Sequence, residues 1–219
     1  MNITDYILKE IQPLTTKSNV KMAQRLFQEH PITHLHLVEE GTLLGSFSES
    51  DIQTLENSET SLESYTSLLD WFFAEESSTV LELLQLFANN DCTILPVLNT
   101  NKKYIGYYDL SDVLDVFTSS PFMLEESEIL VVETQENNFS MSTIAQIVEA
   151  SGCKLLGAYI SEKKEGQVQV TLKIVAQEIN EIIQTFRRYD YTIVSVHEND
   201  VYLDDLKNRS QYLQKYLNM

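Results

Sequence analysis

The side chains that could support nucleophilic chemistry are few and far apart in the sequence. Cys92 and Cys153 each precede a predicted strand, and neither lies in a recognisable pattern with a catalytic histidine. The chain has no Gly-x-Ser-x-Gly, Walker, His-Glu-x-x-His or Gly-x-Gly-x-x-Gly pattern. We therefore expect two small buried thiols, and we expect that the chain is not an enzyme.

Three of the four histidines lie close together, at His30, His34 and His36. We expect His34 and His36 to point to opposite faces of one strand. No nearby carboxylate or cysteine completes a metal-binding motif with them. The sequence therefore predicts packing roles and no metal site, with one further possibility, that His36 faces a cleft and contacts a phosphate.

Two pairs of polar residues share one spacing, Ser48 with Asp51 and Asp109 with Asp112. A serine or aspartate at such a place often accepts a backbone hydrogen bond and begins a helix. An ionised carboxylate can instead accept charge-assisted hydrogen bonds from the hydroxyls of a ligand. The spacing alone favours helix capping.

Both pairs belong to an internal repeat of about sixty residues. Residues 18–20 (Ser-Asn-Val) recur as 78–80 (Ser-Thr-Val), 60 positions later. Residues 45–51 recur as 106–112, 61 positions later. The offset between the copies thus grows by one residue, and we expect this extra residue to lie between the helix and the strand, where an insertion is easily tolerated. Two copies are too few for a solenoid and indicate a pseudo-symmetric pair.

Each copy reads as strand, helix, strand, strand, helix. Ser18 and Ser78 are the expected helix caps. Residues 35–38 and 94–98 are apolar strand candidates. Between the copies, residues 61–74 are rich in Leu and aromatic side chains and predict a packing helix.

The pattern changes after Pro121. Strand and helix candidates then follow in the order βαββαβ, which is the ferredoxin-like arrangement. Residues 201–219 predict a terminal helix with leucines on one stripe. The predicted fold class is therefore α+β, with two pseudo-symmetric repeats and a C-terminal ferredoxin-like domain.

The charge balance excludes several partners. Lys and Arg number 15 against 33 Asp and Glu, a formal net charge of −18. Nucleic-acid binding needs a basic surface, and the one basic cluster near the first copy, Lys17, Lys21 and Arg25, is more typical of a solvated helix face. No apolar run approaches the roughly 18 residues of a membrane span. With two cysteines and no signal peptide, we expect a cytoplasmic protein.

The repeat resembles a tandem pair of CBS domains, together a Bateman module. The family signature is Gly-x-x-Thr/Ser-x-x-Asp at the end of a strand, which residues 45–51 match in full. Residues 106–112 keep the Gly and the last Asp but carry Asp109 in place of Thr or Ser. Pro96 matches the proline of a preceding strand, and Leu35 replaces it in the first copy.

The resemblance covers residues 1–122, with repeats at about 1–60 and 61–122. Residues 127–200 resemble the ACT domain family, although the usual Asp-x-Pro-Gly turn is replaced by residues 135–140. A CBS pair followed by an ACT-like domain resembles the AcuB-like proteins, a family name that does not establish a role in acetoin metabolism.

The resemblance implies which residues would bind a ligand. Asp51 would accept hydrogen bonds from ribose hydroxyls, Ser48 would bond a phosphate or ribose oxygen, and Asp112 is the parallel candidate. Asp109 would repel a phosphate, so we expect the second site to be empty or altered, to take a neutral tail, or to hold a cation. The full set implied is Phe47, Ser48, Asp51, Thr15, Thr16, His36, Asp109 and Asp112.

The resulting hypothesis is a non-catalytic sensor of an adenosine-containing ligand, such as AMP, ADP, ATP or S-adenosylmethionine. The resemblance implies no resident cofactor and implies a homodimer, with the ACT-like domain or an unknown protein partner reading the ligand state. The competing hypothesis is a structural or interaction module whose ligand sites have degenerated. It is motivated by Asp109, by the missing proline at Leu35 and by the acidity.

Overall fold

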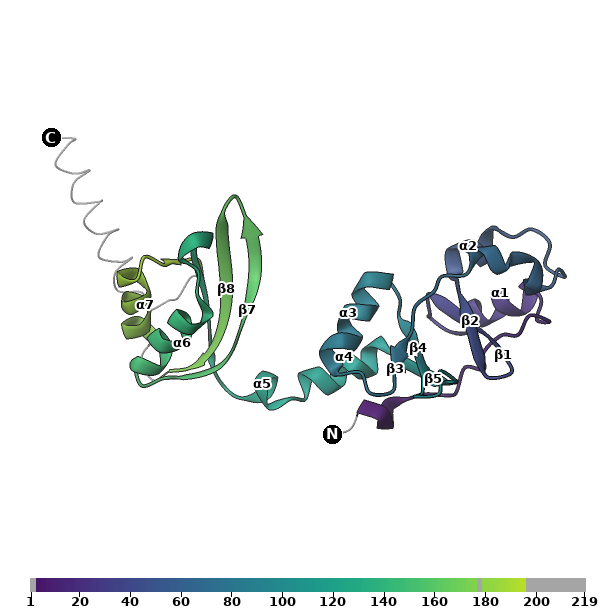
Figure 1. Ribbon diagram of the computed structural model, residues 1–219, viewed down its shortest axis with the longest axis horizontal. Helices are drawn as coiled ribbons and strands as arrows, with labels where there is room; N and C mark the ends of the chain where they lie inside the picture. Colours follow the sequence, from purple (N-terminus) through teal and green to yellow (C-terminus); the bar gives the residue numbers. More distant parts are fainter. Residues whose placement is uncertain (1–2, 177–178, 196–219) are drawn as a thin grey trace. The chain divides into compact units, whose positions relative to one another are not determined.

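The computed structural model describes residues 3–176 and 179–195 (Figure 1). The chain divides into two units, Met1–Met123 and Leu124–Met219. Each unit is described by itself below. The predicted helix at 201–219 lies outside the described residues. No helix in the described ranges combines the length and hydrophobicity that crossing a membrane requires.

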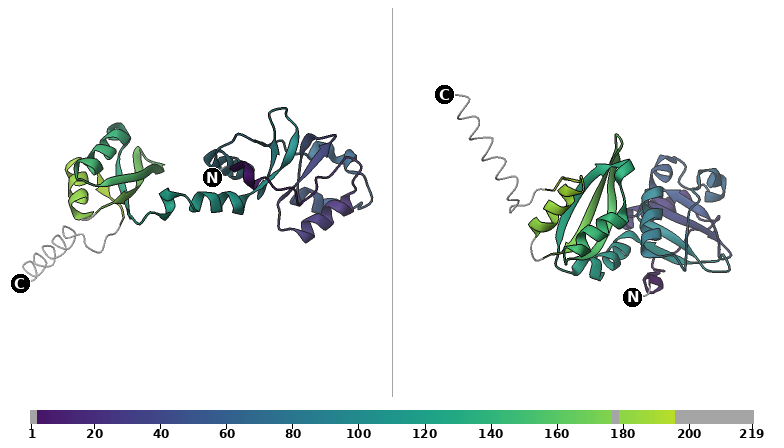
Figure 2. Two further views of the ribbon diagram at one scale, coloured as in Figure 1. Left: turned by 90° about the horizontal axis from the view of Figure 1, so that it is seen from below. Right: turned by 60° about the vertical axis from the view of Figure 1, so that its left-hand side comes forward.

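The first unit contains two copies of one supersecondary motif (Figures 1 and 2). The N-terminal segment begins with a 3-10 turn, η1 (Ile3–Tyr6). The first copy comprises α1 (Val20–Glu29), β1 (His34–Glu39), β2 (Thr42–Ser48) and α2 (Glu49–Thr54). The second copy comprises β3 (Ala74–Glu75), α3 (Val80–Asn90), β4 (Ile94–Leu98), β5 (Tyr104–Asp109) and α4 (Leu110–Thr118). The predicted element order is confirmed, except that the leading strand of the first copy is reduced to one parallel bridge, Leu14 with Leu37.

The strand registers show that the extra residue of the second copy does not lie where the sequence predicted. In the antiparallel β1–β2 pair Leu35 lies opposite Phe47, and in the β4–β5 pair Leu95 lies opposite Tyr108. Leu35 and Leu95 are therefore counterparts, 60 positions apart. The extra residue lies in the turn between β4 and β5, so the prediction of a slip between helix and strand was wrong.

The corrected register changes the partner of the second copy's proline. Pro96 lies opposite Tyr107, and its counterpart His36 lies opposite Ser46. The residue that replaces the proline in the first copy is thus His36 and not Leu35. A histidine–serine pair, joined by a 3.0 Å hydrogen bond between His36 Nδ1 and Ser46 Oγ, stands where the second copy has proline and tyrosine.

The helix caps lie one residue later than predicted. Asn19 caps α1 and Thr79 caps α3, each accepting a hydrogen bond from a backbone N–H of the first turn. Ser18 and Ser78 instead close the preceding turn, because each hydroxyl accepts from the backbone N–H three residues earlier, at 3.1 and 3.2 Å. Both polar positions are thus used, for different purposes.

The linker between the copies is only partly helical. A kinked 3-10 segment, η2 (Leu62–Leu68), is followed by extended chain, so the predicted packing helix over 61–74 was wrong beyond Leu68. The extended part pairs with the edge of β2, where Asp70 and Ser46 exchange two backbone hydrogen bonds of 2.9 Å.

The N-terminal segment makes the equivalent pairing on the second copy. Leu8 and Tyr107 exchange backbone hydrogen bonds of 2.8 and 3.0 Å at the edge of β5. The segment that leads into each copy therefore pairs with a strand of the other copy. We call this arrangement the reciprocal pairing. Thr33 and Thr93 add a symmetric contact, since each hydroxyl accepts a hydrogen bond from the other residue's backbone N–H.

Two glycines permit the reciprocal pairing. Gly45 and Gly106 have φ of +143° and +145°, a region that side chains disfavour. A Cβ on Gly45 would lie 2.8 Å from the Leu69 Cβ and 2.9 Å from the Asp70 carbonyl oxygen. A Cβ on Gly106 would overlap the carbonyl oxygen of Leu8. The glycine of each motif therefore lies where the lead-in segment of the other copy passes close to the strand.

The second unit has the predicted βαββαβ order. After the short helix α5 (Pro121–Leu124), its sheet contains β6 (Glu128–Gln135), β7 (Lys154–Lys164), β8 (Gln167–Val175) and β9 (Thr192–Ile193), in the antiparallel order β7-β8-β6-β9. A 3-10 turn, η3 (Glu136–Asn138), precedes α6 (Met141–Ala150), and α7 (Ile179–Arg188) follows β8. Both helices cover one face of the sheet (Figure 1). This order confirms the ferredoxin-like arrangement.

We expect Gly45→Ala and Gly106→Ala to destabilise the first unit by about 2 kcal/mol or more, because each adds strain at positive φ to an overlap with backbone or packed side chain. Gly152→Ala is the matched control, since Gly152 also has positive φ (+71°) but no atom within 4 Å of the added Cβ. Urea denaturation would measure the losses. An equal loss of unfolding free energy at all three positions would show that the close approach of the backbone at Gly45 and Gly106 is not what requires glycine there.

Candidate functional site

The Ser48–Asp51 pair begins α2 and forms a helix cap. Ser48 Oγ accepts a 3.1 Å hydrogen bond from the Asp51 backbone N–H and donates a 2.8 Å bond to Asp51 Oδ2. The other carboxylate oxygen has no hydrogen-bond partner among the described residues. Capping therefore uses the serine and half of the carboxylate, and it leaves one acceptor oxygen of Asp51 free.

The reciprocal pairing brings an acidic residue of the linker to this end of the first copy. Asp70 Oδ2 lies 3.7 Å from His34 Nε2, and the Phe72 ring meets the His34 ring edge-on at 5.2 Å. Burial lowers the pKa of His34, against the opposing pull of Asp70 and the weaker pull of Asp51. The sequence analysis named His34 but missed its neighbours Asp70 and Phe72, because only the reciprocal pairing brings the linker here.

The same end of the second copy gathers carboxylates. Asp109 caps α4 by accepting a 2.8 Å hydrogen bond from the Ser111 backbone N–H, and the Ser111 hydroxyl donates to the same oxygen. Burial raises the pKa of Asp112, and Asp109, Asp115 and Glu10 raise it further. A phosphate beside these groups would face repulsion rather than a donor.

Other residues of the predicted ligand-binding set are buried or hydrogen-bonded within the first copy. Phe47 is fully buried in the core of the first copy. The backbone N–H and hydroxyl of Thr16 donate to Glu39 Oε2 at 3.2 and 2.8 Å, and these hydrogen bonds lower the pKa of Glu39. Thr15 bonds to Ser18. These groups position the segment before α1 and offer little to a ligand in this structure.

His36 is buried too. Its Nε2 has no hydrogen-bond partner, and burial lowers the pKa of His36 to about 3. A neutral, buried imidazole provides no positive charge for a phosphate. His34 and His36 lie on the same face of β1, because residues two apart on a strand share a face, so the expectation of opposite faces was wrong. No cluster of three or more candidate metal ligands occurs in the described ranges.

Cys92 is buried, and burial raises the pKa of its thiol to about 12. Such a thiol stays protonated and unreactive at neutral pH. Cys153 is partly buried. The prediction of small buried thiols is confirmed for Cys92.

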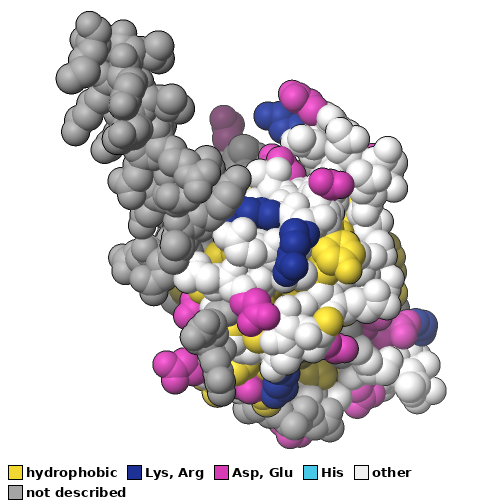
Figure 3. Space-filling view, turned by 90° about the vertical axis from the view of Figure 1, so that its left-hand side faces the viewer, with side chains coloured by type: hydrophobic (Ala, Val, Ile, Leu, Met, Phe, Trp, Pro, Cys, Tyr) yellow, Lys and Arg dark blue, Asp and Glu magenta, His cyan; other side chains and the backbone are white. Residues whose placement is uncertain are grey.

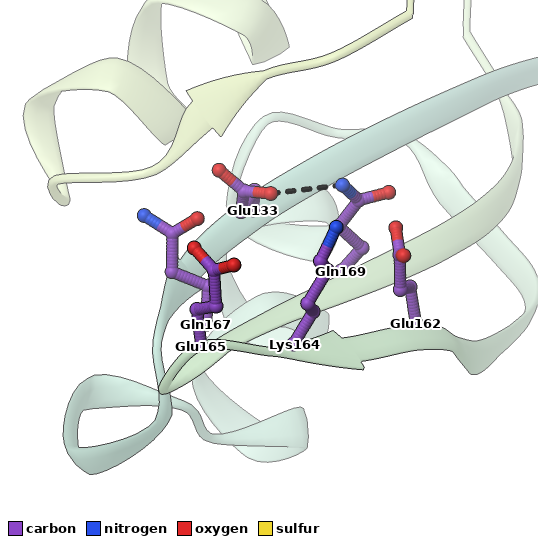
Figure 4. Close-up of a pocket in the computed structure, with 6 residues that line it drawn as sticks. All are labelled: Glu133, Glu162, Lys164, Glu165, Gln167 and Gln169. Carbon is purple, nitrogen blue, oxygen red and sulfur yellow. Dashed lines mark hydrogen bonds between the residues drawn. The ribbon is translucent and has the colours of Figure 1, made fainter.

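The second unit has a hollow of about 280 Å³ near the turn that joins β7 to β8 (Figure 4). Its polar lining includes a 2.8 Å hydrogen bond from Gln169 Nε2 to Glu133 Oε2. The lining residues are Glu133, Glu162, Lys164, Glu165, Gln167 and Gln169. On the face seen in Figure 3, basic side chains are scattered among acidic and uncharged ones and form no continuous patch.

Residues 70–119 match the CBS domain family. No curated protein matches the chain. Among solved structures, a CBS domain pair/ACT domain protein from Thermotoga maritima is 17% identical, with 53% of this chain and 96% of that chain covered and a TM-score of 0.48. CBSX2 in complex with AMP is 20% identical (53% and 95% covered, TM-score 0.43). The cytosolic domain of the Mg²⁺ channel MgtE in complex with ATP is 22% identical (51% and 46% covered, TM-score 0.43).

Buried His36 should make the first unit sensitive to acid. Its pKa lies near 3 in the folded state and at 6.5 in the reference state, so the unfolded chain binds a proton that the folded chain does not. The stabilisation is complete above pH 6.5 and is lost as the pH falls. At pH 5 the loss from this residue is about 2 kcal/mol relative to pH 8.

The measurement is urea denaturation at both pH values for the natural protein and for His36→Gln, which keeps a polar partner for Ser46 but does not titrate. We expect the variant to lose about 2 kcal/mol less on acidification. Identical pH dependence in both proteins would show that His36 is not the acid-sensitive group.

Proposed function

We propose that the protein is a non-catalytic regulatory protein that binds an adenosine-containing ligand in its first unit. The match of residues 70–119 to the CBS domain family supports the regulatory class. The observation that carries the ligand proposal is the free carboxylate oxygen of Asp51 beside Ser48, at the motif position implied by the family resemblance.

The chemistry of the two copies favours the first copy as the ligand site. An ionised Asp51 is an acceptor for two vicinal hydroxyls, as on a ribose. The Ser48 hydroxyl can donate its hydrogen bond to a ligand oxygen if it gives up the one that it donates to Asp51 Oδ2. In the second copy the carboxylates of Asp109, Asp112 and Glu10 disfavour a phosphate.

The reciprocal pairing supplies a route for a signal. Asp70 is held to Ser46 of the first copy and leads directly into β3 of the second copy. A ligand that binds one arrangement of the copies more tightly would shift the population toward it. We include in the proposal a cytoplasmic homodimer whose ferredoxin-like unit, an ACT-like domain, or a protein partner reads that shift.

One observation favours the alternative, a structural or interaction module. Ser48, Asp51 and Asp109 all take part in hydrogen bonds within their own copies. A site that only caps helices would give the same local geometry. This alternative requires a folded protein that binds no adenosine compound.

The test is isothermal titration of the full chain with AMP, ADP, ATP and S-adenosylmethionine. We expect one of them to bind, and we expect Asp51→Asn to weaken it 10- to 100-fold, the value of losing charge-assisted hydrogen bonds of about 1.5–3 kcal/mol. Asp112→Asn is the matched variant in the second copy and should change the affinity less than threefold.

Circular dichroism would confirm that both variants remain folded, since Ser48 still accepts the backbone hydrogen bond in Asp51→Asn. No binding by the natural protein would favour the interaction module. Equal affinity in the natural protein and Asp51→Asn would remove Asp51 from the site.

A further inference from the structure

The sheet of the second unit has one face that its helices cover and one that they do not (Figure 1). Side chains alternate between the two faces along each strand. On β6, Leu130 and Val132 are fully buried beneath α6 and α7. Ile129, one position before Leu130, therefore points to the other face, together with Lys173 opposite it on β8. We call the face that no described helix covers the open face.

The strand register arranges the open face in rows that cross the sheet. Val131 lies opposite Thr171, and Thr171 lies opposite Tyr159. Val194, the residue after β9, lies beside Val131 and donates a 2.9 Å backbone hydrogen bond to its carbonyl. We call these four residues the apolar row. Tyr159 and Val194 are 57% and 43% exposed, and Ile129 beside the row is 47% exposed.

The next row of the open face is acidic. Glu133 lies opposite Gln169, and Gln169 lies opposite Glu162. This row is two residues from the apolar row, about 7 Å along the strands. Its side chains line the polar hollow of about 280 Å³ shown in Figure 4. The hollow also takes in the carboxylate of Glu165 and the ammonium group of Lys164, so its lining carries more negative than positive charge.

The sequence beyond the described residues contains a segment of opposite charge. Residues 206–219 carry three basic side chains and no Asp or Glu, in a chain whose formal net charge is −18. The three are Lys207, Arg209 and Lys215. We call residues 206–219 the basic segment. Its charge complements the acidic row of the open face.

The basic segment also has an apolar stripe. The sequence predicts a helix here, and positions separated by seven and by four residues lie on one side of a helix. The leucines with this spacing are Leu206, Leu213 and Leu217. At 100° per residue, Lys207 and Arg209 flank the stripe on its two sides. Such a helix matches the open face in both apolar character and charge.

The described residues end next to the open face. The Val131 backbone N–H donates a 3.1 Å hydrogen bond to Ser195 Oγ. Ten residues separate Ser195 from Leu206, and ten extended residues reach about 33 Å. A helix over residues 206–219 would be about 21 Å long, whereas four strands span about 14 Å. The basic segment is therefore within reach of the open face and long enough to cross it.

We propose that the basic segment docks as a helix on the open face of its own second unit. The leucine stripe packs on the apolar row, and Lys207 and Arg209 lie toward Glu133 and Glu162. The sheet is then covered on both faces, and the open face is closed to a second copy. This inference concerns the second unit alone and does not depend on the ligand proposed for the first unit.

The test is paramagnetic broadening of amide resonances in the full chain. A nitroxide is attached to Gln211→Cys, an exchange of a polar residue away from the leucine stripe. The partly buried Cys153 is replaced by serine, and the buried, protonated thiol of Cys92 is not expected to react. The same sample with the nitroxide reduced gives the reference spectrum and shows that the protein is folded.

We expect strong broadening at Val131, Gln169 and Thr171 and weaker broadening at Ile147 of α6, which covers the opposite face. A second sample mixes isotope-labelled chain without nitroxide and unlabelled chain with nitroxide. Broadening in this mixture reports a segment that comes from another copy, and we expect none.

Two sets of substitutions separate the apolar and the charged contacts. We expect Leu213→Ser to lower the ratio of docked to undocked segment about tenfold, because a leucine loses its apolar contact. Its matched control is Asn208→Ser, which is off the stripe. We expect Glu133→Gln with Glu162→Gln to lower the ratio about threefold, the size of an exposed ion-pair effect. Glu149→Gln on α6, remote from the open face, is the control.

Three results would overturn the proposal. The first is the absence of broadening on the open face. The second is broadening as strong in the mixed sample as in the singly labelled chain, which would assign the face to a second copy. The third is broadening that Leu213→Ser leaves unchanged.

Discussion

The first unit depends on one constraint, the reciprocal pairing of each lead-in segment with a strand of the other copy. Four backbone hydrogen bonds, two at Leu8 and Tyr107 and two at Ser46 and Asp70, make the pairing. It requires backbone to pass where a Cβ would stand, so Gly45 and Gly106 are needed for packing. The glycine of the motif is therefore structural, and the aspartate six residues later is the motif residue for which we propose a role in ligand binding.

The copies share this frame but differ in chemistry. The first has His36 opposite Ser46 where the second has Pro96 opposite Tyr107. The first caps its second helix with a serine and leaves one oxygen of Asp51 free, whereas the second caps with Asp109. The two copies therefore share one backbone arrangement but present different side chains at their motif ends.

The sequence carried enough information for the larger features. Alternating apolar residues and turn positions predicted the βαββαβ order, and the spaced glycine and aspartate predicted the repeat. The register could not be predicted from the sequence. Residues 94–98 have no charged or hydrogen-bonding side chain, so no alternation of polar and apolar residues distinguishes one alignment with residues 35–38 from the next. Adjacent polar pairs, Ser18-Asn19 and Ser78-Thr79, likewise left the cap position open by one residue.

The parts of the candidate site that were missed share one cause. Asp70 and Phe72 reach His34 through pairing between segments far apart in the sequence, which local patterns do not encode. Burial was misjudged in the same way for His36, on the almost fully buried β1, and for Phe47, which lies on β2 in the core of the first copy.

Amide hydrogen exchange tests most directly the claim that the reciprocal pairing makes the two copies one body. The amides to follow are those of Leu8, Ser46, Asp70 and Tyr107, with Leu37 and Val97 as reporters of the two sheets. We expect all six to exchange with a common opening free energy, that of unfolding the first unit. Fast, independent exchange at Leu8 and Asp70, with both sheets still protected, would contradict the account.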